Sequence, residues 1–449
     1  MPIYNGYSNA FVVLPPTQRQ GYWLFGDHAT FVATGEDTGG QFSLFDFFTL
    51  PQGGPIPHIH TRETEFAYIL EGELSYQMHD QVLTATPGTF VYKPQDHLHS
   101  FVNLGTTPTR HLEFVIPSGI ENLFAAIGQP GPETSPPPPQ LPPPEVLERN
   151  FALLSQYGVE AADSLIFAPT EFNFTRYGTP TVTVLRPGSA EGAVSVTLAV
   201  SDGTEIPVNF ADGERIQTVP IPITNNSLVE GNRTINLALT DPTGGAILGL
   251  LQDTAVLTIG SDSSYTLTNG DEPNDFPLLL PNTQRPSFWL GGENYSFIAT
   301  GADTEGHLSL FDVFVPPQAE PESLISAPGN QAYYILDGNV SFQLANQTFT
   351  ATPNTFIYLP QGNPYALTNL GTAPARTLLF NPQSGLENFF AAVGIPGDPS
   401  TPPPTSVPEP SFIWGLLALV AWSAVSFTNN KLKHQSRMAD TPRNRLHEH

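Results

Sequence analysis

The chain has 449 residues, which is long enough for two or three domains that each bury a core of their own. Its 42 acidic residues outnumber its 16 basic ones, and a formal net charge of −26 repels nucleic acids, so a nucleic-acid-binding protein is excluded. There is no cysteine, so histidine and carboxylate side chains must hold any metal. The 47 prolines and 38 glycines favour short strands joined by tight turns, and the expected fold class is all-β.

The chain contains an internal duplication. A constant offset of 266 positions aligns residues 23–131 with residues 289–397 without a gap. Near the ends of the two copies, "SGIENLFAAIGQPG" matches "SGLENFFAAVGIPG". Runs such as "FAYILEGELSYQM" alternate apolar and polar positions between turn residues, which is typical of the strands of a small antiparallel barrel. We therefore expect two related β-barrels, at residues 21–131 and 285–397.

Histidines and a glutamate in the first copy have the spacing of a metal site. His58 and His60 are separated by one residue, so on a strand both side chains point to the same face. The segments "GGPIPHIHTRETEFAYILEGE" and "PGTFVYKPQDHLHSFVN" resemble the two signature motifs of the cupin superfamily, although the leading glycine is one residue late and Asp96 replaces an inner glycine. Carried over residue by residue, this resemblance places the metal ligands at His58, His60, Glu65 and His99.

Such a ligand set implies one divalent transition metal ion. Three imidazoles and one carboxylate suit Fe, Mn, Ni, Co, Cu or Zn, and the sequence does not choose among these metals. Glu63 and His97 alternate to the opposite face, and we expect both at the surface. We expect His28, His79 and His111 to be surface or core residues without a role in the site.

A longer segment of the first copy points to an activity. "YWLFGDHATFVATGEDTGGQFSLFDFFTLPQGGPIPHIH" resembles bacterial bicupins of the quercetin 2,3-dioxygenase type, which open a flavonol ring with O2. The resemblance implies that an enol oxygen of the substrate binds the metal and that Glu65 accepts its proton as the catalytic base. Six aromatic residues could line an apolar pocket there, although we favour an ordinary core role for each. They are Phe31, Phe47, Phe66, Tyr68, Phe90 and Phe101.

The middle of the chain predicts a linker followed by a third domain. Residues 132–162 combine a Pro-rich linker with a short helix, and residues 163–262 show alternating strands that predict a β-sandwich. Segments such as "LVEGNRTINLALTDPTGGAILG" resemble the Calx-beta family of immunoglobulin-like sandwiches, some of which bind calcium. Of the expected carboxylates only Asp202, Glu230 and Asp262 remain. Because calcium takes six or more oxygen ligands, we favour a structural spacer over a calcium site.

The second copy lacks the predicted metal ligands. At the constant offset, the ligand positions hold Leu324, Ser326, Gln331 and Tyr365, while the Gly, Pro and aromatic framework persists. A barrel that is kept without its ligands implies a role in stability, in pairing with the first barrel, or in holding an organic ligand. We predict no metal in this copy.

The C-terminal region predicts a membrane segment. After a Pro-rich linker at residues 398–410, residues 411–427 form an uncharged apolar run, and the basic tail 428–449 follows. This order predicts a transmembrane helix with its C-terminus in the cytoplasm. With Pro408-Glu409-Pro410 directly before the helix, it resembles the PEP-CTERM sorting signal, which implies export and cleavage by an exosortase; a plain membrane anchor is the alternative. The segment "MPIYNGYSNAFVVLPP" shows no secretory signal, so either the true start lies upstream or export is lost.

Together these patterns predict two cupin barrels flanking a Calx-beta-like sandwich, followed by a transmembrane helix. One function that fits is a metal-dependent dioxygenase of the quercetinase type, acting on a small aromatic or enolic substrate at the cell envelope. The other is a non-catalytic exported envelope protein whose modules bind glycan, metal or protein partners. The expected partners are a small-molecule substrate, an exosortase-type processing enzyme and the membrane. The intact ligand set favours the enzyme, while the tail and the sandwich favour the binding protein.

Overall fold

The structure is a computed structural model that describes residues 12–17, 19–24, 26–138, 143–174, 180–222, 233–259, 279–280, 285–317, 325–327, 329–344 and 347–400. They form two compact units, Pro16–Thr283 and Met1–Pro15 with Gln284–His449. The predicted transmembrane helix, the tripeptide before it and the basic tail lie outside the described residues, as do Glu230 and Asp262. In the described ranges, no helix is both long and apolar enough to span a bilayer.

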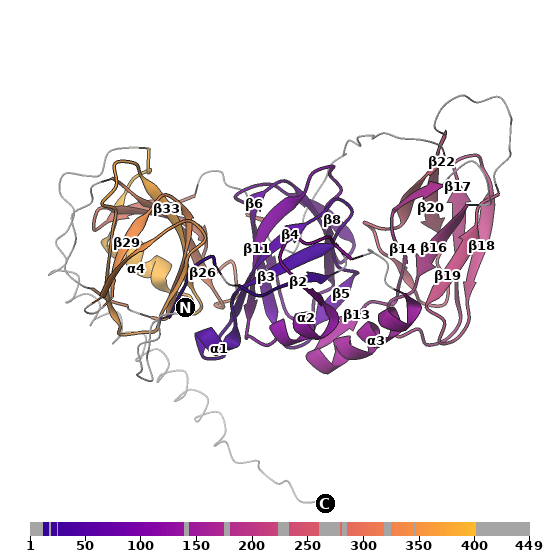
Figure 1. Cartoon of the computed structure of the whole chain (residues 1–449), viewed down its shortest axis with the longest axis horizontal. Helices are drawn as coiled ribbons and strands as arrows, with labels where there is room; N and C mark the ends of the chain where they lie inside the picture. The colour runs from indigo at the N-terminus through magenta and orange to yellow at the C-terminus, as the bar shows by residue number, and fades with distance from the viewer. Residues whose placement is uncertain are drawn as a thin grey trace, which may run out of the picture. The chain divides into compact units, whose positions relative to one another are not determined.

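The first barrel consists of two antiparallel sheets around a core of two apolar clusters, one containing Phe45 and the other Ile69 (Figure 1). In sheet order, the larger sheet contains β12 (Gln129–Pro130), β2 (Gly21–Leu24), β3 (Asp27–Ala33), β4 (Ser43–Thr49), β11 (Thr109–Ile116), β6 (Thr64–Glu71), β9 (Phe90–Lys93) and β23 (Leu279–Leu280). The smaller sheet contains β13 (Val159–Ala161), β5 (His58–His60), β10 (His99–Val102), β7 (Leu74–Met78) and β8 (Gln81–Ala85). Gly72 turns the chain from β6 to β7 with a positive φ of 75°, which glycine adopts without strain.

Helices cover one end of the first barrel, where Figure 1 shows α2 and α3 close together. The helices are α1 (Gly35–Thr38), α2 (Glu121–Ile127), α3 (Pro144–Leu154) and the short 3-10 helix η1 (Ser155–Tyr157). α3 begins with a proline, which suits the first helical turn because the amide there has no partner within the helix. Its apolar residues Leu147, Phe151 and Leu154 recur at the spacing of one helix face.

The segment predicted as a linker is therefore part of the first barrel as well as a connection. Besides forming α3, it supplies β13, which pairs antiparallel with β5 and places Val159 opposite His60 and Ala161 opposite His58. The backbone N–H of Thr61 also donates a hydrogen bond to this segment, with 2.7 Å between its nitrogen and the oxygen of Gly158. The first barrel is thus completed by residues beyond 131.

Residues 164–259 form two sheets that pack around one apolar core. One sheet contains β19 (Ile216–Pro220), β16 (Thr181–Leu185), β14 (Ser164–Phe167) and β21 (Ile247–Leu248). The other contains β15 (Glu171–Phe174), β22 (Thr254–Ile259), β20 (Arg233–Thr240), β17 (Val194–Val200) and β18 (Glu205–Phe210). Along β17, the sequence VSVTLAV alternates buried valine and leucine with less buried residues, as a strand with one face on a core requires.

The two-sheet domain contacts the first barrel through α3 within the same compact unit. Leu147 of α3 packs with Ile166 and Leu185 of the sheets, and Ile56 of the barrel packs against this cluster. The backbone N–H of Leu250 donates to the side-chain oxygen of Gln77 at 3.1 Å. These contacts connect the sandwich to the same helix that covers the barrel end.

The second barrel repeats the architecture of the first. In sheet order, its larger sheet contains β1 (Val12–Leu14), β31 (Phe356–Leu359), β28 (Gln331–Asp337), β33 (Ala375–Asn381), β26 (Ser309–Val315), β25 (Glu293–Ala299), β24 (Ser287–Leu290) and β34 (Ile395–Pro396). Its smaller sheet contains β27 (Ile325–Ser326), β32 (Pro364–Thr368), β29 (Val340–Leu344) and β30 (Gln347–Ala351), and the helix is α4 (Leu386–Val393). The register is the same in both barrels, because Gln331 opposes Leu359 as Glu65 opposes Lys93 at the offset of 266.

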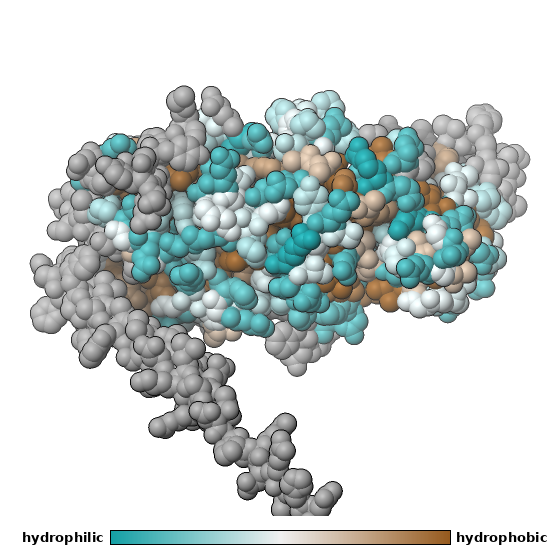
Figure 2. Space-filling view, turned by 90° about the horizontal axis from the view of Figure 1, so that it is seen from below, coloured by the Kyte–Doolittle hydropathy of each residue, from teal (hydrophilic) through white to brown (hydrophobic). Residues whose placement is uncertain are grey.

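The described surface is mainly polar. Figure 2 shows hydrophilic residues spread over much of the face that it draws, with hydrophobic residues between them. Among the described residues, the large hydrophobic side chains with high exposure are Val82, Leu104, Ile247 and Leu370. Because they are few, the interior of the first barrel is the better place to look for chemistry.

Candidate metal centre

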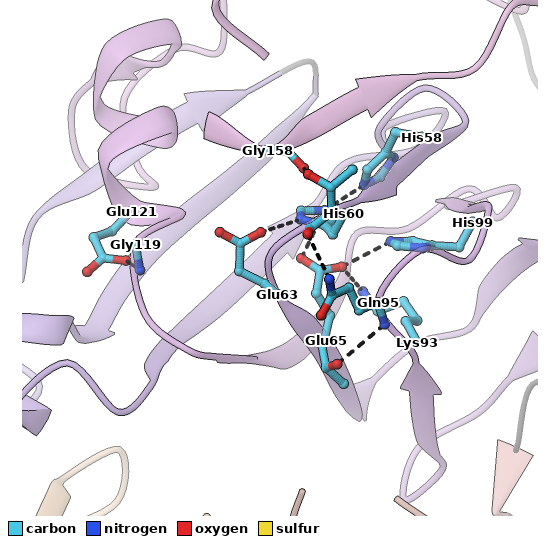
Figure 3. Close-up of polar contacts among 12 residues, drawn as sticks. His58, His60, Glu63, Glu65, Lys93, Gln95, His99, Gly119, Glu121 and Gly158 are labelled. Atoms are coloured by element: carbon cyan, nitrogen blue, oxygen red, sulfur yellow. Dashed lines mark hydrogen bonds and ion pairs between the residues drawn. The ribbon is translucent and has the colours of Figure 1, made fainter. Parts of the chain in front are cut away.

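The four predicted metal ligands come together inside the first barrel. His58 and His60 lie on β5, His99 lies opposite His58 on β10, and Glu65 lies on β6 of the other sheet. One nitrogen or oxygen of each residue lies within 4.8 Å of the others, and all four side chains are buried. Figure 3 shows His58, His60 and His99 turned towards Glu65. No other cluster of three or more histidine, aspartate or glutamate residues with this geometry occurs within the described ranges.

Backbone carbonyl groups orient two of the imidazoles. His58 Nδ1 lies 2.7 Å from the oxygen of Ile56, and His99 Nδ1 lies 2.9 Å from the oxygen of His97. Because a carbonyl only accepts, each Nδ1 carries the proton in this arrangement. The lone pair of each neutral ring is then on Nε2, the atom that faces the centre of the cluster.

The protonation states suit metal binding. Burial lowers the pKa of His58 well below its usual value, and the neighbouring His99 and His60 lower it further. Burial also lowers the pKa of His99. Burial alone would raise the pKa of Glu65, but His60 and Lys93 bring the pKa of this carboxyl well below its usual value. Neutral imidazole and ionised carboxylate are the forms that bind a cation.

The cluster fits one divalent transition metal ion. His99 Nε2 lies 3.0 Å from Glu65 Oε2, and the lone pair of this imidazole would face a carboxylate oxygen unless a cation lay between them. His58 Nε2 and His60 Nε2 are likewise only 3.0 Å apart. Three imidazole nitrogens and one carboxylate oxygen suit Fe, Mn, Ni, Co, Cu or Zn, and such a set leaves coordination positions for a further ligand.

The departure of Asp96 from the cupin motif has a simple structural explanation. Asp96 adopts a positive φ of 65°, the left-handed conformation that the replaced glycine would favour. Aspartate tolerates this conformation better than most residues. Its backbone N–H donates to the oxygen of His60 at 2.8 Å, so the turn that carries His99 is held beside β5.

The prediction that Glu63 lies at the surface is wrong. The residue is only 4% exposed, and its Oε2 lies 3.5 Å from Nδ1 of His60. The strict alternation of a strand does not hold at residues 61–63, because they lie in the bent connection between β5 and β6. Figure 3 shows Glu63 beside the His60 ring, where a carboxylate favours a proton on Nδ1 and a lone pair on Nε2.

The prediction that His97 lies at the surface is confirmed. His28 and His111 are buried, while His79 and His97 are exposed. None of the four lies in the metal cluster.

A cavity of about 110 Å³ lies beside the ligands. Its polar lining includes the four ligands with Asp27, Lys93 and Glu113, and α2 and α3 supply apolar side chains such as Phe124 and Phe151. Of the six aromatic residues considered from the sequence, Phe47 and Phe101 line the cavity. The remaining four are buried core residues, namely Phe31, Phe66, Tyr68 and Phe90.

The buried ion pair of Lys93 and Glu113, which lies next to the ligands, was not predicted from the sequence. Lys93 Nζ lies 3.0 Å from Glu65 Oε2 and 2.7 Å from Glu113 Oε1, and Lys93 is 2% exposed. Burial raises the pKa of Glu113, and the neighbouring Lys93 opposes this rise. Burial likewise raises the pKa of Asp27 to about 8. The available signal was a lysine inside the apolar run "TFVYKPQ" where the second copy has Leu359.

The second barrel shows no such polar centre at the described positions. Gln331 and Tyr365 replace two of the ligands, and Leu324 lies outside the described residues. The hydroxyl groups of Tyr365 and Tyr333 lie 3.0 Å apart, and both side chains are buried in the barrel core. Large side chains thus fill the space that corresponds to the first barrel's ligand cluster.

Comparisons with known proteins agree with the barrel geometry. Residues 46–115 and 311–381 each match the family model described as "Cupin domain". The chain is 31% identical over 100 residues to quercetin 2,3-dioxygenase of Bacillus subtilis (strain 168), a match that covers 22% of this chain and 29% of that protein. The structure of oxalate decarboxylase from Bacillus subtilis at pH 4.6 is similar with a TM-score of 0.43 and 15% identity, over 85% of this chain and 78% of that chain. The two matches to the family model confirm the resemblance to cupins, and the chain carries cupin domains at two places, one within each barrel.

Proposed function

We propose that the chain is a metal-dependent dioxygenase of the quercetinase type that acts on a small aromatic or enolic substrate. One observation carries this proposal: the four clustered ligands form part of the lining of a largely apolar cavity. A purely structural metal site is closed by protein ligands and has no need of an adjoining cavity. An apolar cavity with a few convergent polar groups is instead typical of a small-molecule site.

Glu65 is the residue that would accept a proton in this reaction. The chemistry supplied by a bound divalent transition metal would be the acidification of an enol or phenol oxygen and the activation of its ring towards O2. Glu65 would accept the proton on its carboxylate, which His60 and Lys93 keep ionised by lowering its pKa. Phe47, Phe101 and the side chains of α2 and α3 would surround the ring and exclude water.

A non-catalytic binding protein is the second candidate, and the second barrel favours it. That barrel keeps the cupin fold while Gln331 and Tyr365 occupy ligand positions and its core is filled. If the metal of the first barrel were likewise structural, the barrels and the sandwich would serve to bind glycan or protein partners.

We also propose that the protein works at the cell envelope. The apolar run at residues 411–427, the preceding Pro408-Glu409-Pro410 and the basic tail support export and cleavage by an exosortase. Intact-mass measurement on the full chain expressed in an exosortase-containing host should show loss of the segment after this tripeptide. Retention of the full mass, with the chain in the cytoplasmic fraction, would contradict the proposal.

The sandwich is proposed to be a Calx-beta-like spacer rather than a calcium site. The carboxylate of Asp202 accepts a hydrogen bond from the backbone N–H of Thr204 at 3.0 Å, as in an ordinary turn. Calorimetric titration of the full chain with calcium should detect no site in this domain, and a stoichiometric calcium site lost in Asp202→Ala would overturn the spacer role.

The test of the main proposal combines metal analysis with oxygen uptake. The purified full chain should contain about one transition metal ion per chain and should consume O2 with quercetin or with the one-ring enolone 3-hydroxypyran-4-one. Glu65→Gln should lower the rate by about a hundredfold or more at saturating metal, because the proton acceptor is lost. Gln331→Met, at the matching position of the second barrel, should leave the rate unchanged. Bound metal without O2 uptake on any enolic substrate would favour the binding protein.

A further inference from the structure

Burial of the Lys93–Glu113 pair costs desolvation free energy in the first barrel. Both residues are at most 3% exposed, and burying two charges costs several kcal/mol per ion before their attraction offsets it. The pair is not isolated, because Lys93 Nζ also lies 3.0 Å from Glu65 Oε2. Tyr76 and His111 are buried close to the pair. His111 Nε2 lies 3.7 Å from Glu113 Oε2. Burial raises the pKa of Tyr76 well above its usual value, and the charge of Glu113 raises it further.

The second barrel shows that the fold does not require this pair. At the constant offset of 266, Leu359 occupies the position of Lys93 and Leu379 occupies the position of Glu113, in the same strand register. Both leucines are fully buried in the apolar core, and Phe342 stands for Tyr76 beside them. At these three positions, polar groups occur in the barrel that has the metal ligands and apolar groups in the other.

The cavity gives the pair access to a ligand. Lys93 and Glu113 line the same cavity as Glu65, and the remaining walls are largely apolar, with Phe47 and Phe101 among them. An ammonium group has three N–H donors, and the two carboxylates within 3.0 Å account for two of them among the described residues. The ring of Phe101, which also lines the cavity, has its centroid 5.9 Å from Nζ, and the third donor is left for a ligand there.

The size of the cavity limits the ligand. Its volume of about 110 Å³ is close to that of a dry apolar cavity of about 150 Å³ that holds benzene. Sites for larger organic ligands measure about 300 Å³ or more. The volume therefore suits one six-membered ring better than the three rings of a flavonol.

We propose that Lys93 is a substrate-binding residue that holds the second oxygen of a compact, one-ring anionic substrate whose first oxygen binds the metal. This inference rests on the proposed function and adds to it the charge and size of the substrate. Glu113 holds Lys93 in place through the ion pair of 2.7 Å. An enolone or hydroxy acid with two adjacent oxygens on one ring has the required chemistry, because one oxygen can bind a cation while the other accepts an N–H bond.

The experiment measures binding rather than turnover. The full chain is loaded with Co(II), and the Kd for 3-hydroxypyran-4-one is read from the visible absorption of the metal. The double variant Lys93→Leu/Glu113→Leu copies the residue pair of the second barrel, so it should fold and keep its Co(II). Its Kd for this anion should be at least about tenfold weaker than that of the parent chain, since a hydrogen bond to a charged group is lost. The control variant Leu359→Met/Leu379→Met, in the second barrel, should not change the Kd.

Two further probes test the charge and the size. The methyl ether of the enolone cannot ionise, so its weak binding should be the same with and without Lys93. Quercetin, with three rings, should bind at least about tenfold more weakly than the one-ring enolone. Quercetin binding as tightly as the enolone would overturn the size limit.

The remaining outcomes separate this proposal from others. An unchanged Kd in the double variant with full Co(II) content would overturn the role of Lys93. Loss of Co(II) in that variant would also overturn it, because Lys93 would then serve only to hold Glu65. A chain that binds the enolone through Lys93 but consumes no O2 would contradict the dioxygenase and support this proposal.

Discussion

The two barrels share a strand register and differ in what their interiors contain. In the first, Glu65 faces Lys93 across β6 and β9; in the second, Gln331 faces Leu359 across the corresponding strands. Apolar residues and two tyrosines fill the second interior, while charged groups and a cavity occupy the first. Since both sequences form the barrel, the buried charges of Glu65 and Lys93 are not needed for its fold. They are better explained by the chemistry of a site.

The largest expected effect comes from removing a ligand that the second barrel lacks. His99→Ala should reduce the bound metal from about one ion per chain to none after dialysis, because the imidazole that faces Glu65 is lost. Metal analysis of the purified variant measures this. Tyr365→Phe, at the matching position, should leave the metal content unchanged, and a loss there would mean that the second barrel also holds metal.

The next effect concerns stability. Lys93→Leu alone leaves Glu65 and Glu113 buried without their shared cation, which should destabilise the first barrel by about 3–5 kcal/mol. Adding Glu113→Leu restores the pair found in the second barrel and should recover most of this loss. Denaturant unfolding of both variants measures the difference, and a double variant as unstable as the single one would show that the barrels are not interchangeable at this pair.

A smaller effect is expected in the pH dependence of stability. Burial raises the pKa of Asp27 from 3.8 to about 8, so between these values the unfolded chain releases a proton that the folded chain retains. The stability contributed by the protonated group is complete below about pH 4 and is lost as the pH rises towards 8. In Asp27→Asn, the Tm of the first barrel should therefore fall less between pH 5 and pH 8, by a few degrees. An equal fall in both chains would place the pH dependence elsewhere.

The smallest effect is on metal affinity. Glu63→Gln removes the charge that faces His60 Nδ1 at 3.5 Å and should weaken metal binding by about tenfold. Competition with a chelator measures the affinity. An affinity unchanged by Glu63→Gln but lowered by Glu63→Ala would assign this residue a packing role.

The sequence predicted the parts of the site that are local in the chain. His58, His60 and Glu65 lie within eight positions and share the geometry of neighbouring strands, so the motif spacing places them together. The barrels also followed from the repeat and the strand pattern. Lys93 was missed because its partner Glu113 comes from a strand that is distant in sequence, and the pairing of such strands is set by the whole fold.

The role of β13 and α3 beside the site could not be predicted from the sequence for a different reason. The proline-rich composition of residues 132–162 indicates a linker, but composition does not show that Val159 pairs with His60 or that Phe151 lines the cavity. Tertiary packing decides the role of such a segment, since α3 is covered on one face by the barrel and the sandwich.

The strand β13 also determines the shortest fragment of the chain that could fold with the metal site intact. A fragment that ended at residue 131 would leave the edge of β5 unpaired beside two metal ligands and would open the cavity on the side of α3. Unpaired strand edges invite association with other chains, so such a fragment would be prone to aggregate. In evolutionary terms, the inherited module here is longer than the repeated barrel, and a duplication or transfer that kept the metal chemistry would have to carry residues up to 161 with it.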